Sequence, residues 1–590
     1  MANSEMRIGT LSEDTHDLIQ EDFDSDILVQ ERARKRHMHV IGANGSGKSR
    51  FLRSLIQQDI RNGKGVAVLD PHGTLCDDVV KWLADRPLLA GERKVRVFDI
   101  GKGEDILSLN PLAVGDIKSE TATVATRLAD AVGRLFTKEE LQEQPLTFEV
   151  MIMLFVSLAE HGMTLGDYHI FLDPSRKEER EHLIAGLHST NTRRQWELLA
   201  NYKDHEFVAY VSSVSRRLYT LLENPIINKT LTAKKNALDF RKAMDKGEIL
   251  LFNLRDTTLF DPTSAQLLGL LLISSFFNAA SVRKNTKPFF LYMDEAHRYM
   301  SSRTAEIFEQ SRKFGLHLIL AHQNLGQLRE AGERIFGTVI NEAAVKVIFQ
   351  INEPDSADYL ARLVFSSKVD PNKIKDVLTK PTVVGYTIET LISYSQAESN
   401  SYFDSESWAT NQSENSGMTI TELPTAHTLD EARKTEAVSS NTGIGSTHGS
   451  TYGTGTSNSS GYTETPTVLP VYENRPGGTW PIEEQMFVLA NEITSLPIQH
   501  GIISIKAAKK KQAAGSETLK FRALDVADLH TPKFITKEYR QELRWQNPYI
   551  LSSKKAQKLA EKRQVKLIEK INKERQQERV EREDGFEVWD

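Results

Sequence analysis

A glycine-rich segment between an apolar strand and a helix constrains the fold of this chain most. It follows an expected strand at 38–41 and opens an expected helix at 51–60, and it reads Gly42, Ala43, Asn44, Gly45, Ser46, Gly47, Lys48 and Ser49. This order fits the phosphate-loop pattern G-x-x-x-x-G-K-[ST]. Glycines let backbone N–H groups curl around phosphate oxygens, and the helix amino terminus adds partial positive charge. The segment predicts a nucleotide site in which Lys48 reaches the β- and γ-phosphates and Ser49 ligates Mg²⁺.

Two adjacent acids end a later apolar strand, at 289–293. Phosphoryl transfer needs an acid in the metal shell and, in hydrolases, a carboxylate that orients water. We predict that Asp294 holds Mg²⁺ and that Glu295 polarises the attacking water. Residues 294–297 also spell the Asp-Glu-Ala-His box of one class of helicases, but the sequence lacks that class's Ser-Ala-Thr element and late Gln/Arg-rich motif. We therefore expect His297 to pack or hydrogen-bond beside the site rather than to catalyse.

Two further polar residues flank the next expected strand, at 316–320. Gln323 follows its end, where a polar side chain can touch the γ-phosphate or the water and report its loss. Simple capping of the strand is the alternative. Arg312 precedes the strand, and a guanidinium there can serve as an arginine finger for a neighbouring subunit's nucleotide. The spacing alone favours a solvated basic face for Arg312.

Strands and helices alternate around these motifs, which indicates an α/β fold with a mainly parallel sheet covered on both faces. Between 115 and 235 the strand signals stop and the apolar spacing is helical throughout. Later, a Ser-, Thr- and Gly-rich stretch cannot bury enough apolar area to offset its ordering entropy. The expected divisions are a flexible segment at 1–27, a motor at 28–114, a helical insertion at 115–235, more motor at 236–392, a low-complexity loop at 393–470, a return to the motor at 471–530 and a charged helical tail at 531–590.

Composition excludes several other classes of protein. The net charge of -6 gives no global positive field, so any DNA site must be local. Cys76 is the only cysteine, which excludes an intrachain disulfide and zinc sites with two or more thiolates. The amino terminus has no apolar run, and the apolar stretch at 267–280 is too short to span a bilayer, so we interpret it as a buried helix. We expect a cytoplasmic protein without membrane insertion.

The motifs occur in an order that resembles the HerA and FtsK superfamily of RecA-fold motors, most closely the branch of type IV secretion coupling proteins. The resemblance covers about residues 30–365, and more weakly 480–510. Its blocks are 36–42 leading into the phosphate loop, Asp-Pro-His-Gly at 70–73, Asn-Pro-Leu at 110–112, 247–254, 292–296, 311–315 and Ala-His-Gln at 321–323. The β-barrel of archaeal HerA proteins and the amino-terminal membrane helices of coupling proteins have no counterpart in these blocks.

This resemblance implies a RecA-like P-loop NTPase core with an inserted all-helical domain. It also implies that Lys48 and Ser49 bind ATP and Mg²⁺, that Asp294 holds metal, that Glu295 is the catalytic carboxylate and Gln323 the sensor, and that Arg312 is a finger given in trans. The assembly would be a homohexamer that pumps DNA through a central channel by sequence-independent phosphate contacts. The alternatives are a receptor that delivers nucleoprotein cargo to a secretion machine, and a regulatory ATPase that activates a partner nuclease. The basic tail at 554–582 would be solvated or would touch DNA or an acidic partner.

Overall fold

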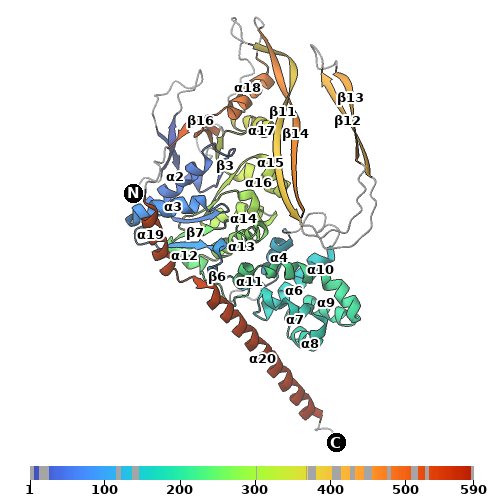
Figure 1. The fold of residues 1–590 in the computed structure, drawn as a ribbon. Helices are drawn as coiled ribbons and strands as arrows, with labels where there is room; N and C mark the ends of the chain where they lie inside the picture. Colours follow the sequence, from blue (N-terminus) through green and yellow to red (C-terminus); the bar gives the residue numbers. More distant parts are fainter. Residues whose placement is uncertain are drawn as a thin grey trace. The chain divides into compact units, whose positions relative to one another are not determined.

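The computed structural model describes residues 5–11, 26–113, 121–133, 135, 145–300, 302–366, 369, 381–401, 413–424, 432–443, 455–474, 480–506, 516–524 and 531–586 (Figure 1). Two compact units make up the chain, and they are described separately. Unit 1 comprises Met1–Ser367 and Leu489–Asp590, and unit 2 comprises Lys368–Val488. All the candidate site residues belong to unit 1.

An eleven-stranded sheet forms the centre of unit 1, in the order β2-β1-β16-β15-β10-β3-β9-β8-β4-β7-β5. The seven strands from β10 to β5 are parallel, and the other four pair antiparallel. Buried residues run almost without interruption through the parallel strands, as expected for a sheet covered on both faces. The predicted α/β class with a mainly parallel sheet is confirmed. The strands are β1 (Glu5–Leu11), β2 (Asp26–Gln30), β3 (Met38–Ile41), β4 (Gly65–Asp70), β5 (Val95–Asp99), β7 (Ile249–Asn253), β8 (Phe289–Met293), β9 (Leu316–His322), β10 (Val345–Phe349), β15 (His500–Lys506) and β16 (Ser516–Ala523).

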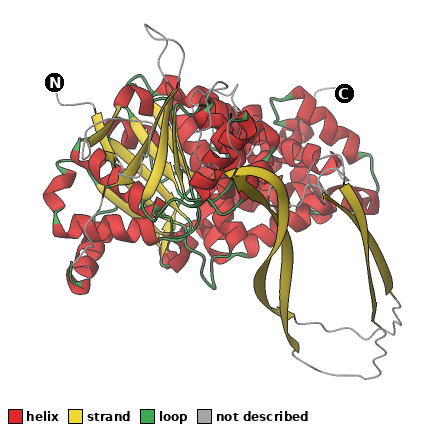
Figure 2. Ribbon diagram, turned by 90° about the horizontal axis from the view of Figure 1, so that it is seen from above, coloured by secondary structure: helices red, strands yellow, loops and turns green. Residues whose placement is uncertain are grey.

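Helices cover the two faces of this sheet, each over its own hydrophobic core (Figure 2). Alternation along the strands divides the side chains: in β7, Leu250 and Phe252 join one core, and Ile249 and Leu251 join the other. The first of these cores includes α12 (Phe240–Lys246), α13 (Pro262–Ser281), α14 (Ser302–Gln310), α15 (Leu325–Ala331), α16 (Glu333–Glu342) and α17 (Pro354–Phe365). The opposite face carries α2 (Lys48–Arg61), α3 (Thr74–Asp85) and α19 (Lys533–Trp545), and the short α1 (Glu31–Arg34) precedes β3.

Between β6 (Asp105–Leu107) and β7 the described chain is helical. Its helices are α4 (Thr121–Gly133), α6 (Pro145–Glu160), α7 (Tyr168–Leu172), α8 (Lys177–Ala185), α9 (Thr190–Ala200), α10 (Asp204–Glu223) and α11 (Pro225–Leu231). Large buried side chains such as Phe155, Phe171 and Trp196 join these helices to the core on that side of the sheet. Among the described residues, α13 is the one helix that is long and apolar enough to cross a membrane, and 67% of its apolar window is buried. A bent helix pair at 146–172 would be a second candidate if the pair counts as one span.

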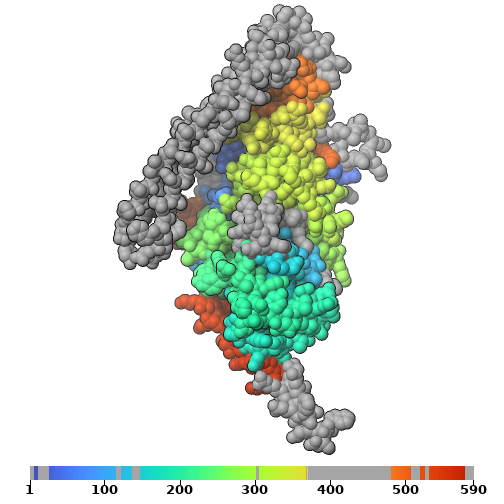
Figure 3. Space-filling model, turned by 90° about the vertical axis from the view of Figure 1, so that its right-hand side faces the viewer, coloured from blue at the N-terminus to red at the C-terminus, as the bar shows by residue number. Residues whose placement is uncertain are grey.

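The carboxy-terminal elements belong to unit 1 and pack against its other elements. The charged tail is therefore not purely solvated. Helix α19 lies against α3 and β5, and the side chain of Asn547 donates to the Val97 carbonyl at 3.0 Å, which covers the open edge of β5. Strand β17 (Ile550–Ser552) then pairs with β6, and α20 (Ser553–Phe586) runs along the insertion. In Figure 3 the red atoms of α20 lie beside the teal atoms of the insertion.

Two of the expected divisions differ from the structure. Part of the supposedly flexible 1–27 segment is β1, because Met6 and Ile8 alternate with polar residues and bury their side chains. Within 393–470, where we expected a weakly ordered loop, unit 2 contains two antiparallel pairs: β11 (Pro381–Ser401) with β14 (Gly455–Asn474), and β12 (Ser413–Pro424) with β13 (Ala432–Gly443). Backbone ladders satisfy the polar groups of such strands without a large apolar core. Helix α18 (Ile482–Thr494) follows.

Candidate nucleotide-binding site

The phosphate loop connects β3 to α2 at the carboxyl edge of the parallel strands. Gly45 and Gly47 have φ values of 81° and 105°, a left-handed backbone that suits glycine. A Cβ on Gly42 would come within 2.6 Å of Phe349 Cβ, so this close approach also needs glycine. The Ala43 N–H donates to the Gln350 carbonyl at 2.7 Å, and the Gln499 N–H donates to the Ser46 carbonyl at 2.9 Å. The loop is thus held in shape by the neighbouring β10 and by the turn before β15.

The residues of this loop fit a bound triphosphate. A Cβ built on Gly45 meets nothing within 4 Å, so its backbone faces open space. The Ser46 hydroxyl is buried and has no hydrogen-bond partner among the described residues. Lys48 begins α2 with its side chain buried, while Ser49 beside it is exposed. Together they offer a helix amino terminus, a cation and free hydroxyls, which is the donor set that phosphate oxygens and Mg²⁺ require.

The predicted acids lie next to this loop. Strand β8 ends at Met293, and the backbone of Glu295 is left-handed, with φ of 47°, which costs energy in a non-glycine residue. This turn directs the Glu295 carboxylate toward Lys48, and Lys48 Nζ lies 3.5 Å from Glu295 Oε1. Lys48 Nζ also donates to the Gly42 carbonyl at 3.3 Å. The loop lysine is therefore paired internally and must leave Glu295 when it contacts a phosphate.

Asp294 is the second buried acid, with 3% of its surface exposed. Burial raises its pKa to about 6, the Lys48 cation opposes this effect, and the nearby charges of Asp70 and Glu295 add to it. A carboxylate kept in an unfavourable environment gains by contact with a divalent cation. Asp294 therefore has the chemistry expected of a metal-binding group.

Gln323 and His297 complete the surroundings of Glu295. The Gln323 amide donates to Glu295 Oε1 at 3.0 Å, and His297 Nδ1 lies 3.4 Å from Glu295 Oε2. Burial lowers the pKa of His297, while the Glu295 charge opposes this effect. The structure thus brings together Lys48, Glu295 and Gln323, and it gives His297 the neighbouring position that the sequence predicted.

Two family models match parts of the chain that carry this geometry. The central domain of the helicase HerA matches residues 8–116, which hold the phosphate loop, and the TraM recognition site of TraD and TraG matches residues 288–379, which hold the acid pair and Gln323. Together these two matches support a HerA/FtsK-type P-loop ATPase near the type IV secretion coupling proteins.

Solved structures resemble this chain over most of its length. The plasmid coupling protein TrwB in complex with ADP and Mg²⁺ is 12% identical with a TM-score of 0.50, over 89% of this chain and 95% of that chain. An unbound form of TrwB is 12% identical with a TM-score of 0.49, over 86% and 90% of the two chains. VirB4 of Thermoanaerobacter pseudethanolicus is 14% identical with a TM-score of 0.41, over 62% and 88%. The first likeness shows the fold, and no curated protein sequence matches significantly.

A buried histidine pair joins the two strands that lead into the site of this ATPase. His39 on β3 and His322 on β9 place their Nε2 atoms 2.6 Å apart, so one ring must donate and the other accept. Burial lowers the pKa of His39 to about 3 and that of His322 well below its ordinary value, which keeps both rings neutral. No sequence pattern predicts this pair, because its members are far apart in the chain and only strand pairing brings them together.

A buried ionic cluster supports β8 from the side of α2. Arg34 donates to both carboxylate oxygens of Asp59, at 2.9 and 2.7 Å, and the Tyr292 hydroxyl donates to Asp59 at 2.6 Å. Tyr292 lies two residues before Asp294. Asp70 is also buried and accepts three backbone N–H groups, from His72, Gly73 and Cys76, so it holds the turn before α3.

Arg312 is not brought to this site. It lies exposed just before β9 begins, at the amino edge of the parallel strands, where its charge adds to the burial that lowers the pKa of His37. Within one chain the sheet therefore separates Arg312 from the phosphate loop. Its role as a finger remains a prediction, and it requires a second subunit.

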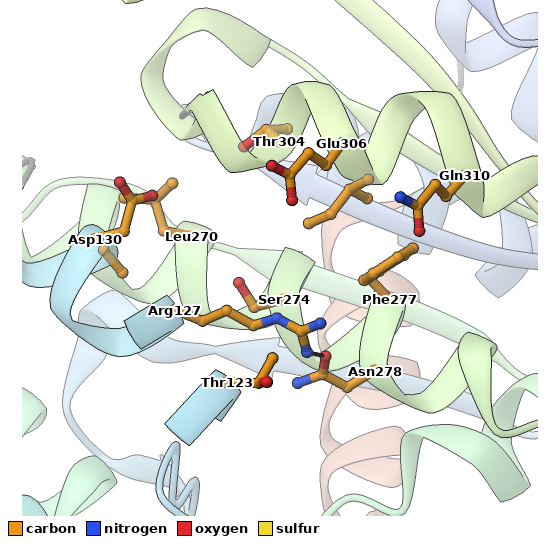
Figure 4. A pocket seen from close by; sticks show the side chains of 12 residues that line it. Thr123, Arg127, Asp130, Leu270, Ser274, Phe277, Asn278, Thr304, Glu306 and Gln310 are labelled. Carbon is orange, nitrogen blue, oxygen red and sulfur yellow. Dashed lines mark hydrogen bonds between the residues drawn. The ribbon is translucent and has the colours of Figure 1, made fainter. Parts of the chain in front are cut away.

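A cavity of about 260 Å³ lies elsewhere, between α4, α13 and α14 (Figure 4). Its lining includes Arg127, Asp130 and Glu306, and Arg127 donates a hydrogen bond to Asn278. None of the residues that line it belongs to the phosphate loop or to the acid pair. We therefore assign it no part in nucleotide binding.

Proposed function

We propose that the protein is a cytoplasmic ATP-hydrolysing DNA translocase, a homohexamer that moves DNA through a central channel by sequence-independent phosphate contacts. One observation carries the ATPase part of this proposal: Lys48 Nζ and Gln323 Nε2 both meet Oε1 of Glu295, at 3.5 and 3.0 Å, beside the buried Asp294. A cation, a carboxylate and an amide at the end of a phosphate loop are the groups that nucleotide hydrolysis requires. TrwB, whose fold is similar, has been solved with ADP and Mg²⁺.

The chain's own residues suggest how hydrolysis would proceed. The loop amides and Lys48 would bind the phosphates, and Lys48 would thereby release the Glu295 carboxylate. Glu295, still oriented by Gln323, would accept a hydrogen bond from the attacking water and hold it in line with the γ-phosphorus. Mg²⁺, held by Ser49 and Asp294, would neutralise charge on the β- and γ-phosphates. Gln323 would then report loss of the γ-phosphate to β9.

The family supports transport of DNA as the work that hydrolysis performs. HerA-type and coupling-protein models match both halves of the motor. Phosphate contacts in a channel would make DNA binding independent of sequence and sensitive to salt. The net charge of -6 does not oppose this, because a ring needs positive charge only where DNA passes. Arg312 would act on the nucleotide of the adjacent subunit.

A second candidate is a coupling receptor that passes nucleoprotein cargo to a secretion or conjugation machine. The match of residues 288–379 to the TraM recognition site of TraD and TraG favours it. Hydrolysis would then serve release of the cargo rather than continuous movement along DNA. In this candidate, free duplex DNA would not stimulate the enzyme.

ATP hydrolysis with and without duplex DNA, at two salt concentrations, tests the proposal. Lys48→Ala and Glu295→Gln should each reduce the rate about 100-fold or more. The matched controls Lys284→Ala and Glu342→Gln change exposed residues of the same types and should keep the wild-type rate. A wild-type protein that never hydrolyses ATP would overturn the proposal. Hydrolysis without stimulation by any nucleic acid would replace the translocase with the receptor.

A further inference from the structure

Helix α20 is fixed to the insertion along one of its faces. Arg563 donates to both oxygens of the fully buried Asp167, at 2.6 and 2.9 Å. Lys229 donates to the Ser553 hydroxyl at 2.8 Å, and Ala556 and Ile571 are buried, with 6% and 3% of their surfaces exposed. These contacts extend over five turns of the helix, so α20 is a supported element that presents its other face in a defined direction.

The opposite face of α20 carries a row of lysines, here called the lysine face. It consists of Lys554, Lys555, Lys558, Lys562, Lys566, Lys570 and Lys573, all exposed. With about 100° between successive residues of a helix, these seven fall within an arc of about 160°, and the anchored residues fall on the other side. The row is about 29 Å long, at about 1.5 Å per residue. The only acid within the arc is Glu569.

The charges of the lysine face are largely uncompensated. Lys570 pairs with Glu574 at 3.4 Å, and the other six lysines make no ion pair with any described residue. Like charges four residues apart destabilise a helix, by about 0.2–0.5 kcal/mol for each pair. The chain as a whole is acidic, with a net charge of -6, so this concentration of positive charge is a local feature. A polyanion that lies along the helix would relieve the repulsion.

We propose that the lysine face binds the phosphate backbone of duplex DNA and guides it past the helical insertion. The inference rests on the proposed function for its choice of DNA as the polyanion. Helices that bind membrane surfaces insert a continuous apolar face into the lipid, whereas Ala556 and Ile571 of α20 are packed against protein and, of its described apolar side chains, only Leu559 and Val565 are exposed among the lysines. Residues 553–577 contain no aromatic side chain for stacking on bases, which favours a duplex over a single strand.

The test uses the full-length protein and a fluorescent duplex of random sequence. The variant K554Q/K558Q/K562Q/K566Q removes four unpaired charges, and the control K94Q/K246Q/K284Q/K287Q removes four exposed lysines of the motor. If each of the four lysines of α20 contacts one phosphate, the salt slope of binding should fall by about 3.6. Wild type and control should then lose about 150-fold more affinity than the lysine-face variant between 50 and 200 mM salt. ATP hydrolysis without DNA should be unchanged.

The outcomes separate this inference from the proposed function. If the lysine-face variant and wild type bind DNA with equal affinity and equal salt slope, the proposal that the lysine face binds DNA is refuted. Because both proteins would still bind DNA, that result would not contradict the proposed translocase. A wild type that binds no DNA would overturn both. Vesicles with and without anionic lipid form a further arm: lysine-dependent binding to anionic vesicles alone would assign the face to a membrane surface and refute DNA. An unchanged circular dichroism spectrum and melting temperature verify that the variant is folded.

Discussion

The replacement Asp294→Asn should stabilise the protein while it removes the proposed metal-binding group. Asp294 is buried beside Asp70 and Glu295, and its folded pKa of about 6 stands above the ordinary value of 3.8. The folded protein therefore holds this proton more tightly than the unfolded chain does. Stability is lost as the pH rises through the window from about 4 to 6, and the whole loss is present above it.

The size of the effect follows from the same two values. The difference between 3.8 and about 6 corresponds to about 3 kcal/mol at pH 7.5, and about half of that is present at pH 5. Asparagine has nearly the same shape and no charge, and its amide oxygen can still accept the Glu295 N–H, which donates to Asp294 Oδ1 at 3.1 Å. Asp294→Asn should thus raise the free energy of unfolding by about 3 kcal/mol at pH 7.5 and by about half as much at pH 5.

Urea unfolding without nucleotide or Mg²⁺, followed by circular dichroism at both pH values, measures this gain. The control Asp85→Asn changes an exposed aspartate and should shift stability by less than about 0.5 kcal/mol. The same Asp294→Asn protein should lose Mg²⁺-dependent ATP hydrolysis. A gain below about 1 kcal/mol at pH 7.5, or an equal gain at both pH values, would refute the reasoning from burial and neighbouring charge.

Three other replacements test separate contacts. Tyr292→Phe removes a donor to the buried Asp59 and should cost about 1–2 kcal/mol in urea unfolding, and an unchanged midpoint would contradict the role given to that cluster. Gln323→Ala should lower kcat, because the Gln323 amide contacts Glu295, but it should leave the affinity for a fluorescent nucleotide within a few fold of wild type. Weakened nucleotide binding with an unchanged kcat would contradict the role of Gln323 in positioning Glu295. Arg563→Gln leaves the buried Asp167 without its cation and should lower the free energy of unfolding by about 3 kcal/mol. Limited proteolysis of this variant should then cleave between α19 and α20. An unaltered cleavage pattern would show that other contacts hold α20.

Local pattern was sufficient to predict the centre of the site. The phosphate loop, the acid pair and Gln323 each follow a short apolar strand. Parallel strands bring their carboxyl ends to one edge of a sheet, so these residues had to meet once the strands were parallel and adjacent. The 3.5 Å contact between Lys48 and Glu295 is the outcome of that topology.

Contacts that join distant parts of the chain could not be predicted in the same way. The pairing of His39 with His322 depends on β3 and β9 being neighbours, which no local spacing specifies. Strand β1 could have been found, since Met6 and Ile8 alternate with polar residues, but the acidic composition of the segment hid this short signal. In 393–470, composition argued against a packed core but said nothing of backbone pairing, which forms β11 to β14.

The bond from the Gln499 N–H to the Ser46 carbonyl has a consequence for biosynthesis. A ribosome synthesises residues 42–49 about 450 residues before it reaches the turn at 499. Domains begin to fold from their amino-terminal parts during translation. The phosphate loop of the nascent chain therefore lacks this hydrogen bond for some time. Chains that end before this turn should therefore bind nucleotide weakly. We expect ATP hydrolysis only from chains that include the turn.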